Sequence, residues 1–225
     1  MKTAVVTGAQ KGIGFATAKK FLDNGWKVIG TYHGAPAPFA SENLISVPLE
    51  LTSPQDIARA AEDIKKVAPE IDVLVNNAGV LLDSSDPTVN MDILRKTFEV
   101  NVFGLIDFTE RMIPLMHAGS HILNMDSGYG SFSEPIDDAT SSAYRISKAA
   151  LNMYTRVAAL HVKEKGIIVS SIAPGWVKTD MGVSIASDTE KPDRTPEDAA
   201  NDIYNLAIAN PESGFFWEYG KKRDW

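Results

Sequence analysis

The strongest constraint on the fold is a series of short apolar runs, rich in valine and isoleucine, that recur along the chain. They are nearly continuous in hydrophobicity, which is typical of strands buried on both faces of a parallel sheet. Longer segments with helical spacing of apolar residues separate them. The apolar runs lie at 3–7, 27–32, 44–49, 72–77, 121–125 and 167–172, and the helical segments at about 13–24, 54–67, 88–117, 143–164 and 196–209.

Strands that alternate with helices predict an α/β fold of three layers, with a doubly wound parallel sheet between two helical layers. With 225 residues, no long linker and no internal repeat, the chain is expected to form a single domain. The segment 33–43, rich in Gly, Pro and Ala, predicts a lost or shortened helix between the second and third strands. The segments near 128–142 and 182–195 are expected to be surface loops.

The composition excludes several kinds of site. A net charge of −7 speaks against a nucleic-acid-binding surface, and the absence of cysteine excludes disulfides, thiol nucleophiles and thiolate metal sites. The four histidines are scattered, so no metal site is expected. No apolar run is long enough for a signal-peptide core or a membrane span. We therefore expect a soluble, cytoplasmic protein without a nucleic-acid or membrane partner.

A glycine-rich turn, TGAQKGIG at 7–14, follows the first apolar run and precedes the first helical segment. Glycine permits positive φ and a close approach of the backbone to a ligand. The free N–H groups and the positive dipole end of the following helix favour a phosphate group there. The spacing G-x-x-x-G-x-G differs from the more familiar G-x-G-x-x-G pattern, and a tight turn without a ligand is the alternative interpretation.

Tyr144 and Lys148 stand four residues apart at the start of a helical segment, so they lie on the same face of the helix. Such a pair by itself is common on protein surfaces. The other interpretation is chemical, because a nearby ammonium group favours the ionised phenol and lowers its pKa from about 10. Lowering the pKa by about three units would require roughly 4 kcal/mol.

Several motifs in one order decide between these interpretations: TGAQKGIG, the NNAG of 76–79, Asn101, Ser127, YRISK at 144–148 and PGWVKT at 174–179. Together they resemble the short-chain dehydrogenase/reductase family, from residue 3 to about residue 180. The closing SGFFWEYGKKRDW is similar to the last strand and tail of carbonyl reductase-like members. The resemblance implies a Rossmann-type fold, a nicotinamide cofactor and an oxidoreductase that acts on carbonyl compounds or secondary alcohols.

The resemblance also implies the catalytic residues. Tyr144 would be the acid in carbonyl reduction and the base in alcohol oxidation, while Lys148 would lower its pKa and hold the nicotinamide ribose. Ser127 would hydrogen-bond the substrate oxygen, with Ser131 as a rival for this role. The family's usual pair of serines is Asp126-Ser127 in this chain.

Asn101 is the fourth implied catalytic residue. An asparagine among apolar residues in the middle of a helix is unfavourable unless its amide has partners. In the family, this asparagine kinks the helix and holds a water that links the lysine to solvent. The alternative is an ordinary polar residue on a helix face.

The cofactor is expected to be NADP(H) rather than NAD(H). The second strand ends in GTYHG, without the acidic residue that would bond the ribose 2′-hydroxyl and repel a 2′-phosphate. Lys11 and His33 give a neutral-to-basic pocket instead, although the family's usual arginine after this strand is absent. The resemblance implies cofactor contacts from Gly8, Gln10, Lys11, Gly12, Ile13, Gly14, Tyr32, His33, Glu50, Leu51, Asn77, Ala78, Gly79, Tyr144, Lys148, Pro174, Gly175, Val177 and Thr179.

Tyr129, Phe132 and Trp176 are expected to contact the substrate, together with the loops near 128–142 and 182–195. These side chains indicate an apolar or aromatic carbonyl compound. The alternative function is a nucleotide-sensing regulatory or signalling protein that keeps the fold but has little turnover. Such proteins typically lose the tyrosine or the lysine, and both are present here. The sequence leaves open the physiological substrate, the reaction direction and a homo-oligomeric assembly.

Overall fold

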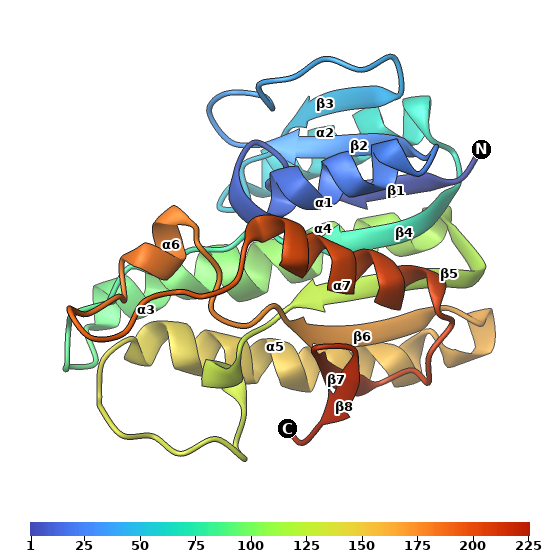
Figure 1. Cartoon of the computed structure of the whole chain (residues 1–225). Coiled ribbons are helices and arrows are strands. Elements are labelled where there is room, and N and C mark those ends of the chain that lie inside the picture. Colours follow the sequence, from blue (N-terminus) through green and yellow to red (C-terminus); the bar gives the residue numbers. More distant parts are fainter.

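Eight strands form one sheet in the order β3-β2-β1-β4-β5-β6-β7-β8 (Figure 1). The computed structural model describes every residue from Met1 to Trp225. All neighbouring strands are parallel except β7 and β8, which are antiparallel. The strands are β1 (Thr3–Val6), β2 (Lys27–Tyr32), β3 (Leu44–Pro48), β4 (Ile71–Asn76), β5 (Met116–Met125), β6 (Ile168–Ala173), β7 (Phe215–Glu218) and β8 (Lys221–Arg223).

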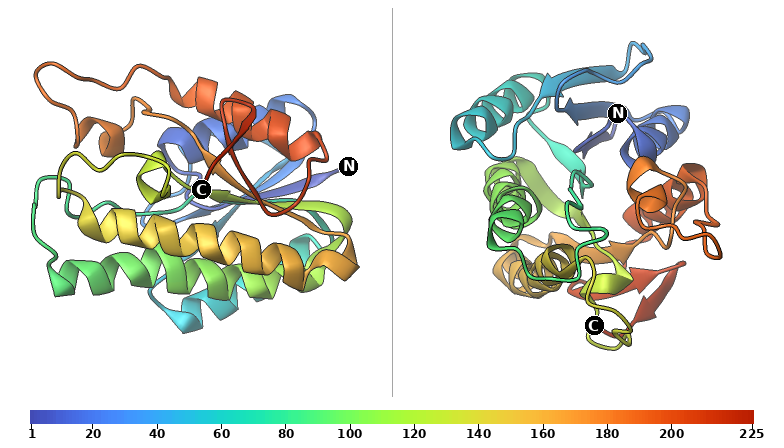
Figure 2. Two further views of the ribbon diagram at one scale, coloured as in Figure 1. Left: turned by 90° about the horizontal axis from the view of Figure 1, so that it is seen from below. Right: turned by 90° about the vertical axis from the view of Figure 1, so that its left-hand side faces the viewer.

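Helices cover both faces of the sheet and make the three layers visible in Figure 2. On one face α1 (Gly12–Asp23) packs against α7 (Pro196–Ile208). The other face carries α2 (Pro54–Val67), α3 (Met91–Phe98), α4 (Leu105–Met112) and α5 (Ser142–His161). The short helix α6 (Asp180–Val183) lies outside both layers, in the connection that follows β6.

Each layer of helices has its own hydrophobic core against the sheet, and the strands contribute to both. In β1, Val5 belongs to the core under α2, α4 and α5, whereas Ala4 and Val6 belong to the core under α1 and α7. All three side chains are fully buried. Burial on both faces explains why the strands appear in the sequence as continuous apolar runs.

The three-layer α/β fold predicted from the sequence is confirmed. The segment 33–43 contains no helix, as expected, and the helices α2 and α7 begin at Pro54 and Pro196, as the helical segments 54–67 and 196–209 predicted. Ser53 accepts a hydrogen bond from the Asp56 amide, and Thr195 forms a capping box with Asp198. None of the helices is long and apolar enough to cross a membrane.

The helical segment predicted over about 88–117 is helical from Met91 to Leu115, but it is not one regular α-helix. The segment consists of α3, a π-helical turn η1 (Glu99–Gly104), α4 and a 3₁₀ turn η2 (Ile113–Leu115). The wider turn places the Asn101 amide against the backbone of Val80, where it both donates and accepts. Pro114 lies in the closing 3₁₀ turn, and β5 begins directly after it, five residues earlier than the apolar run suggested.

The carboxyl ends of the parallel strands meet at one edge of the sheet, and the strand order reverses between β1 and β4. A reversal of this kind opens a crevice beyond the strand ends, which is where ligands bind in doubly wound folds. The loops near 128–142 and 182–195 also lie at this edge, opposite the N-terminus (Figure 1).

Candidate active site

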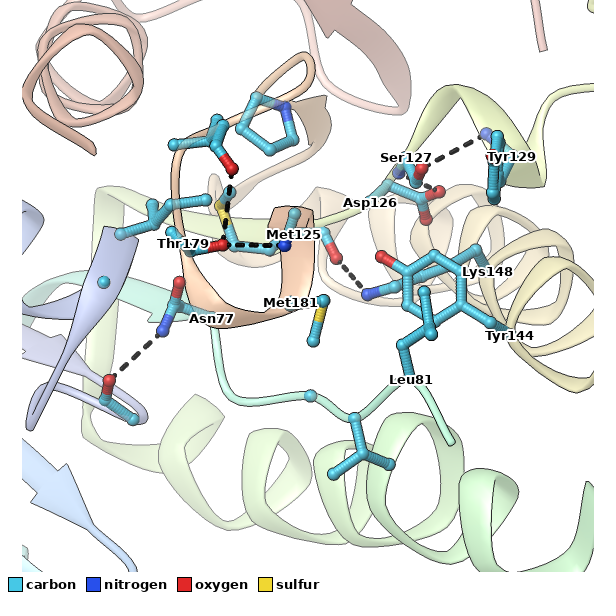
Figure 3. A pocket seen from close by; sticks show the side chains of 18 of the residues that line it. Asn77, Leu81, Met125, Asp126, Ser127, Tyr129, Tyr144, Lys148, Thr179 and Met181 are labelled. Carbon is cyan, nitrogen blue, oxygen red and sulfur yellow. Dashed lines mark hydrogen bonds between the residues drawn. The ribbon is translucent and has the colours of Figure 1, made fainter. Parts of the chain in front are cut away.

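A cleft of about 1440 Å³ lies at the carboxyl edge of the sheet. Its walls come from the turns after β1, β2, β3 and β4, from the start of α5 and from the chain that follows β5, β6 and β7. Figure 3 shows Asp126, Ser127, Tyr144 and Lys148 gathered on one side of this pocket, with Asn77 and Thr179 on the other. No group of three or more His, Asp or Glu side chains is arranged to hold a metal ion.

The glycine turn after β1 forms one end of the cleft. Gly8 and Gly12 have φ values of 68° and 55°, which only glycine adopts readily. A Cβ on Gly14 would lie 2.2 Å from the Gly8 carbonyl oxygen, so the turn folds back closely on the start of α1. The Asn77 side chain fixes the turn through a 2.8 Å bond to the Thr7 carbonyl. The first turn of α1 therefore presents its free N–H groups to the cleft.

Tyr144 and Lys148 lie in the first two turns of α5, and both are almost completely buried, with 8% and 4% of their surface exposed. The Lys148 ammonium lies 5.5 Å from the centre of the Tyr144 ring. It donates a 2.6 Å hydrogen bond to the Met125 carbonyl at the end of β5. The pair is therefore not an ordinary surface pair.

The ionisation of Tyr144 differs from the expectation. Burial raises its pKa above the ordinary value, and the Asp126 carboxylate adds to the increase, while a hydrogen bond with Ser127 lowers it. Burial also lowers the pKa of Lys148, which the Asp126 carboxylate partly restores. The loss of water around the phenol, rather than the attraction of the lysine expected from the sequence, is the main influence on the Tyr144 pKa.

The structure separates the two serine candidates. Ser127 lines the cleft directly after β5, and its hydroxyl oxygen accepts a 3.2 Å hydrogen bond from the Tyr129 amide. Ser131 is buried away from the cleft, where its hydroxyl bonds Ser133 and the Asp224 carbonyl. The location of Ser127 favours it over Ser131 as the residue that meets a ligand.

Asn101 lies behind the cleft rather than in its wall. It is fully buried in η1, and its side-chain amide donates 2.9 Å and 3.1 Å hydrogen bonds to the Val80 carbonyl and the Ser147 hydroxyl. The side-chain oxygen accepts from the Val80 amide at 2.8 Å. Asn101 therefore joins the segment after β4 to α5 through Ser147, the residue before Lys148.

The sequence matches the family model described as short chain dehydrogenase over residues 2–190. The chain belongs to this family. One curated relative is the oxidoreductase UcpA of Escherichia coli K12, which is 31% identical over 226 residues and matches 93% of this chain and 83% of the relative. Another is the 3-oxoacyl-[acyl-carrier-protein] reductase FabG of Salmonella typhimurium LT2, which is 32% identical over 195 residues and matches 83% of this chain and 78% of the relative. An NADPH-bound carbonyl reductase from chicken fatty liver is similar in structure, with a TM-score of 0.88 and 26% identity, covering 100% of this chain and 94% of the reductase.

Short-chain dehydrogenases use nicotinamide cofactors, and the cleft of this member suits such a dinucleotide. The glycine turn leaves room for a backbone approach, and the N–H groups of α1 are suitable donors for a diphosphate. The opposite wall holds the proton-bearing groups of Tyr144 and Lys148. Every residue expected to contact the cofactor lines the cleft.

The two basic residues expected to favour NADP(H) already have acidic partners in this dehydrogenase. Lys11 forms a 2.7 Å ion pair with Asp180 on α6, and His33 Nδ1 lies 2.8 Å from a carboxylate oxygen of Glu50. The Lys11–Asp180 pair spans from the glycine turn to the start of α6, and both side chains are largely exposed. At these two positions each basic group is therefore paired with a carboxylate.

Of the three expected substrate contacts, Tyr129 and Trp176 line the cleft and Phe132 does not. Phe132 is 86% exposed and lies outside the cleft wall. Ser131 and Ser133 on either side of it bond the Asp224 carbonyl in the C-terminal segment. Tyr129 instead faces Tyr144 edge to face and stacks against the Arg145 guanidinium at 3.8 Å.

Ten charged residues that line the cleft were given no role from the sequence. They are Asp126, Glu134, Asp137, Asp138, Arg145, Lys178, Asp180, Glu190, Glu218 and Arg223. In the sequence, Asp126 stands where the family usually has a serine, and this difference was the only local indication of its importance. Arg223 reaches the cleft only because β8 folds back on β7 and bonds Glu218 and Glu134, a long-range arrangement without a local sequence signal.

Proposed function

We propose that the protein transfers a hydride between NADP(H) and a carbonyl compound or secondary alcohol, with Tyr144 as the acid or base. The observation that carries the proposal is the convergence of Tyr144, Lys148 and Ser127 on one wall of a cleft whose far end is the glycine turn. Carbonyl reduction needs a hydride at carbon and a proton at oxygen. Bound NADPH supplies the hydride.

Tyr144 is suited to give the proton during reduction. Its buried phenol has a raised pKa and is therefore protonated at neutral pH. When the proton moves to the carbonyl oxygen, the phenolate left behind gains stability from the ammonium of Lys148. In the direction of alcohol oxidation, the same phenolate accepts the proton.

Ser127 is suited to bind the substrate oxygen. Its hydroxyl oxygen accepts a bond from the Tyr129 amide, and its own proton can be donated either to Tyr144 or to a carbonyl oxygen that enters the cleft. A donor fixed in this way stabilises the negative charge that develops on that oxygen. Asn101 supports the site from behind through Ser147, the residue next to Lys148 in α5.

The preference for NADP(H) belongs to the same proposal. Lys11 and His33 are suitable partners for a 2′-phosphate, and no acidic residue ends β2. The similarity to a carbonyl reductase that was solved with NADPH supports this choice. Lys11 would exchange Asp180 for the phosphate, and the exposure of both side chains makes that exchange inexpensive.

The substrate we propose is a carbonyl compound with an apolar group beside the reacting carbon. Leu81 and Met181 line the same pocket as Tyr144 (Figure 3), and Tyr129 and Trp176 add to this apolar lining. The charged residues of the cleft lie around this lining and suit a polar group at the other end of the substrate. A second copy of the chain as a partner stays a prediction.

The test is an NADPH-depletion screen over aldehydes, ketones, quinones and pterins, followed by Tyr144→Phe. We expect this substitution to lower turnover by about 10²–10⁴-fold, because the proton donor is lost, while NADPH binding is retained. Tyr154→Phe on the same helix, whose hydroxyl bonds Glu110 away from the cleft, is the matched control. Unchanged turnover in Tyr144→Phe refutes the acid role, and binding of NADPH without turnover of any carbonyl favours the regulatory alternative.

A further inference from the structure

Asp126 is a buried carboxyl group directly beside the proposed catalytic residues. It follows the last residue of β5 and has 3% of its surface exposed. One carboxylate oxygen, Oδ1, accepts a 2.7 Å hydrogen bond from the Ser127 amide. The other, Oδ2, has no hydrogen-bond partner, since the hydroxyl of nearby Ser171 donates to Asn152 instead. An acid with one unpartnered oxygen in a buried position is costly, so it needs a functional reason.

The backbone around Asp126 is tightly fitted to α5. The Lys148 ammonium bonds the carbonyl of Met125, the residue before Asp126. A Cβ on Gly130 would lie 2.8 Å from Asp126 Oδ1 and 2.7 Å from Lys148 Cβ, so only a glycine fits between them. Asp126 therefore has a fixed position relative to the Tyr144–Lys148 pair.

Charged and titratable groups from two elements act on Asp126. Tyr144 and Lys148 of α5 lie on the same side of the pocket (Figure 3), and the charge of Arg223 on β8 also influences its carboxyl group. Arg223 is already bonded to two carboxylates, those of Glu218 and Glu134. The ammonium of Lys148 is therefore the main positive charge that acts on Asp126.

We propose that Asp126 is a positioning residue, which fixes Ser127 through its amide and holds the Tyr144 hydroxyl in its protonated form. The proposal rests on the proposed function, because it concerns the proton that Tyr144 exchanges with substrate. Its consequence is a preference in direction: the site donates a proton to a carbonyl at neutral pH, and accepts one from an alcohol only at high pH.

The electrostatics agree with this geometry. Burial raises the pKa of Asp126 to about 7, although the Lys148 ammonium and the Ser127 amide act in the opposite direction. Asp126 is therefore ionised throughout the alkaline range in which phenols lose their proton. A carboxylate in a site that excludes water makes a second negative charge on Tyr144 unfavourable.

The test compares the wild type with Asp126→Asn, which removes the charge and keeps an oxygen for the Ser127 amide. Between about pH 7, where Asp126 becomes ionised, and the midpoint of the pH profile, alcohol oxidation with NADP⁺ should be about tenfold faster in Asp126→Asn, because that midpoint moves down by about one unit. Carbonyl reduction at pH 6 should change by less than about threefold. Asp63→Asn on α2, an exposed carboxylate paired with Lys66, controls for the loss of one charge.

A second measurement does not depend on turnover. Protein made with 3-fluorotyrosine gives a fluorine NMR signal for Tyr144, assigned through Tyr144→Phe, and this signal is followed against pH with and without NADP⁺. We expect it to start moving at a lower pH in Asp126→Asn and in Asp126→Ser, the second variant in case the first does not fold. The proposal is overturned if the signal moves at the same pH in the wild type and in the variants. It is also overturned if the signal stays unmoved up to the same pH in all of them. If no carbonyl or alcohol is turned over, the proposed function fails, while this titration still decides the role of Asp126.

Discussion

At the scale of single residues, basic side chains of this cleft are paired with carboxylates, which the residue types alone do not show. Lys11 was expected as a free cation for a phosphate, yet Asp180 lies 2.7 Å from its ammonium. The lysine holds the pKa of Asp180 below its ordinary value through a hydrogen bond and its charge. A cofactor phosphate therefore competes with a carboxylate for the same ammonium group.

This competition predicts opposite effects for the two partners. Lys11→Ala should weaken NADPH binding by about tenfold and leave NADH binding nearly unchanged, because only NADPH has the 2′-phosphate. Asp180→Asn should strengthen NADPH binding slightly, since it frees the ammonium. Fluorescence titrations of both cofactors measure these effects. Equal binding of NADPH and NADH that neither variant alters would contradict the location of the phosphate pocket.

At the same scale, the residue types of the site could be predicted and their electrostatics could not. The spacing of Tyr144 and Lys148, and the position of Ser127 after an apolar run, are local features of the sequence. The raised pKa of Tyr144 depends on burial and on Asp126, which the fold brings together from β5 and α5. Phe132 was misplaced for a similar reason, because the direction of its loop is set by bonds to the C-terminal segment.

At the scale of elements, the π-helical turn η1 connects the site to the sheet. Asn101 bonds the segment after β4, and Gly104 packs against the carbonyl of Leu51 in the turn after β3. A helical period within each half of the segment does not reveal such a turn, because the extra residue only shifts the phase between two regular helices, α3 and α4. The segment 88–117 was therefore predicted as one helix.

The packing of η1 makes Gly104 a sensitive position. A Cβ at Gly104 would lie 2.0 Å from the Leu51 carbonyl oxygen, which is backbone and cannot rotate away. We expect Gly104→Ala to lower the free energy of unfolding by about 2–3 kcal/mol. Gly128→Ala is the control, because its Cβ would meet nothing closer than 3.5 Å. Urea denaturation of both variants decides the matter, and equal stabilities would show that η1 shifts without cost.

At the scale of the whole molecule, stability should depend on a buried histidine far from the cleft. His121 on β5 is 1% exposed, and its ring bonds the Ser170 hydroxyl at 2.9 Å. Burial lowers the pKa of His121 to about 4. Between pH 6.5 and 4 the unfolded chain therefore binds more protons at this residue than the folded protein, so acid favours unfolding.

We expect His121 to reduce the free energy of unfolding by up to about 3 kcal/mol as the pH falls from 6.5 to 4. Asp126 acts in the opposite sense: its stabilising contribution is complete below about pH 4 and is lost as the pH rises through 7. Urea denaturation of the wild type and His121→Gln at several pH values separates the two. If the difference between them is the same at pH 7 and pH 4.5, His121 does not titrate as described.

The fold itself was the most predictable property of the molecule. Continuous apolar runs and helix-capping residues such as Ser53 and Thr195 are local signals that the tertiary structure does not overrule. The β7–β8 hairpin could not be predicted from such local signals. Its antiparallel return depends on pairing between strands and on Arg223 reaching Glu134, 89 residues away.

The C-terminal segment has a practical consequence for anyone who produces this protein. Asp224 and Trp225 bond the backbone and hydroxyls of the loop at 131–133, which borders the substrate end of the cleft. A purification tag attached after Trp225 would begin next to that loop. A tag before Met1 would begin at the opposite edge of the sheet, so kinetic work should use an N-terminal fusion.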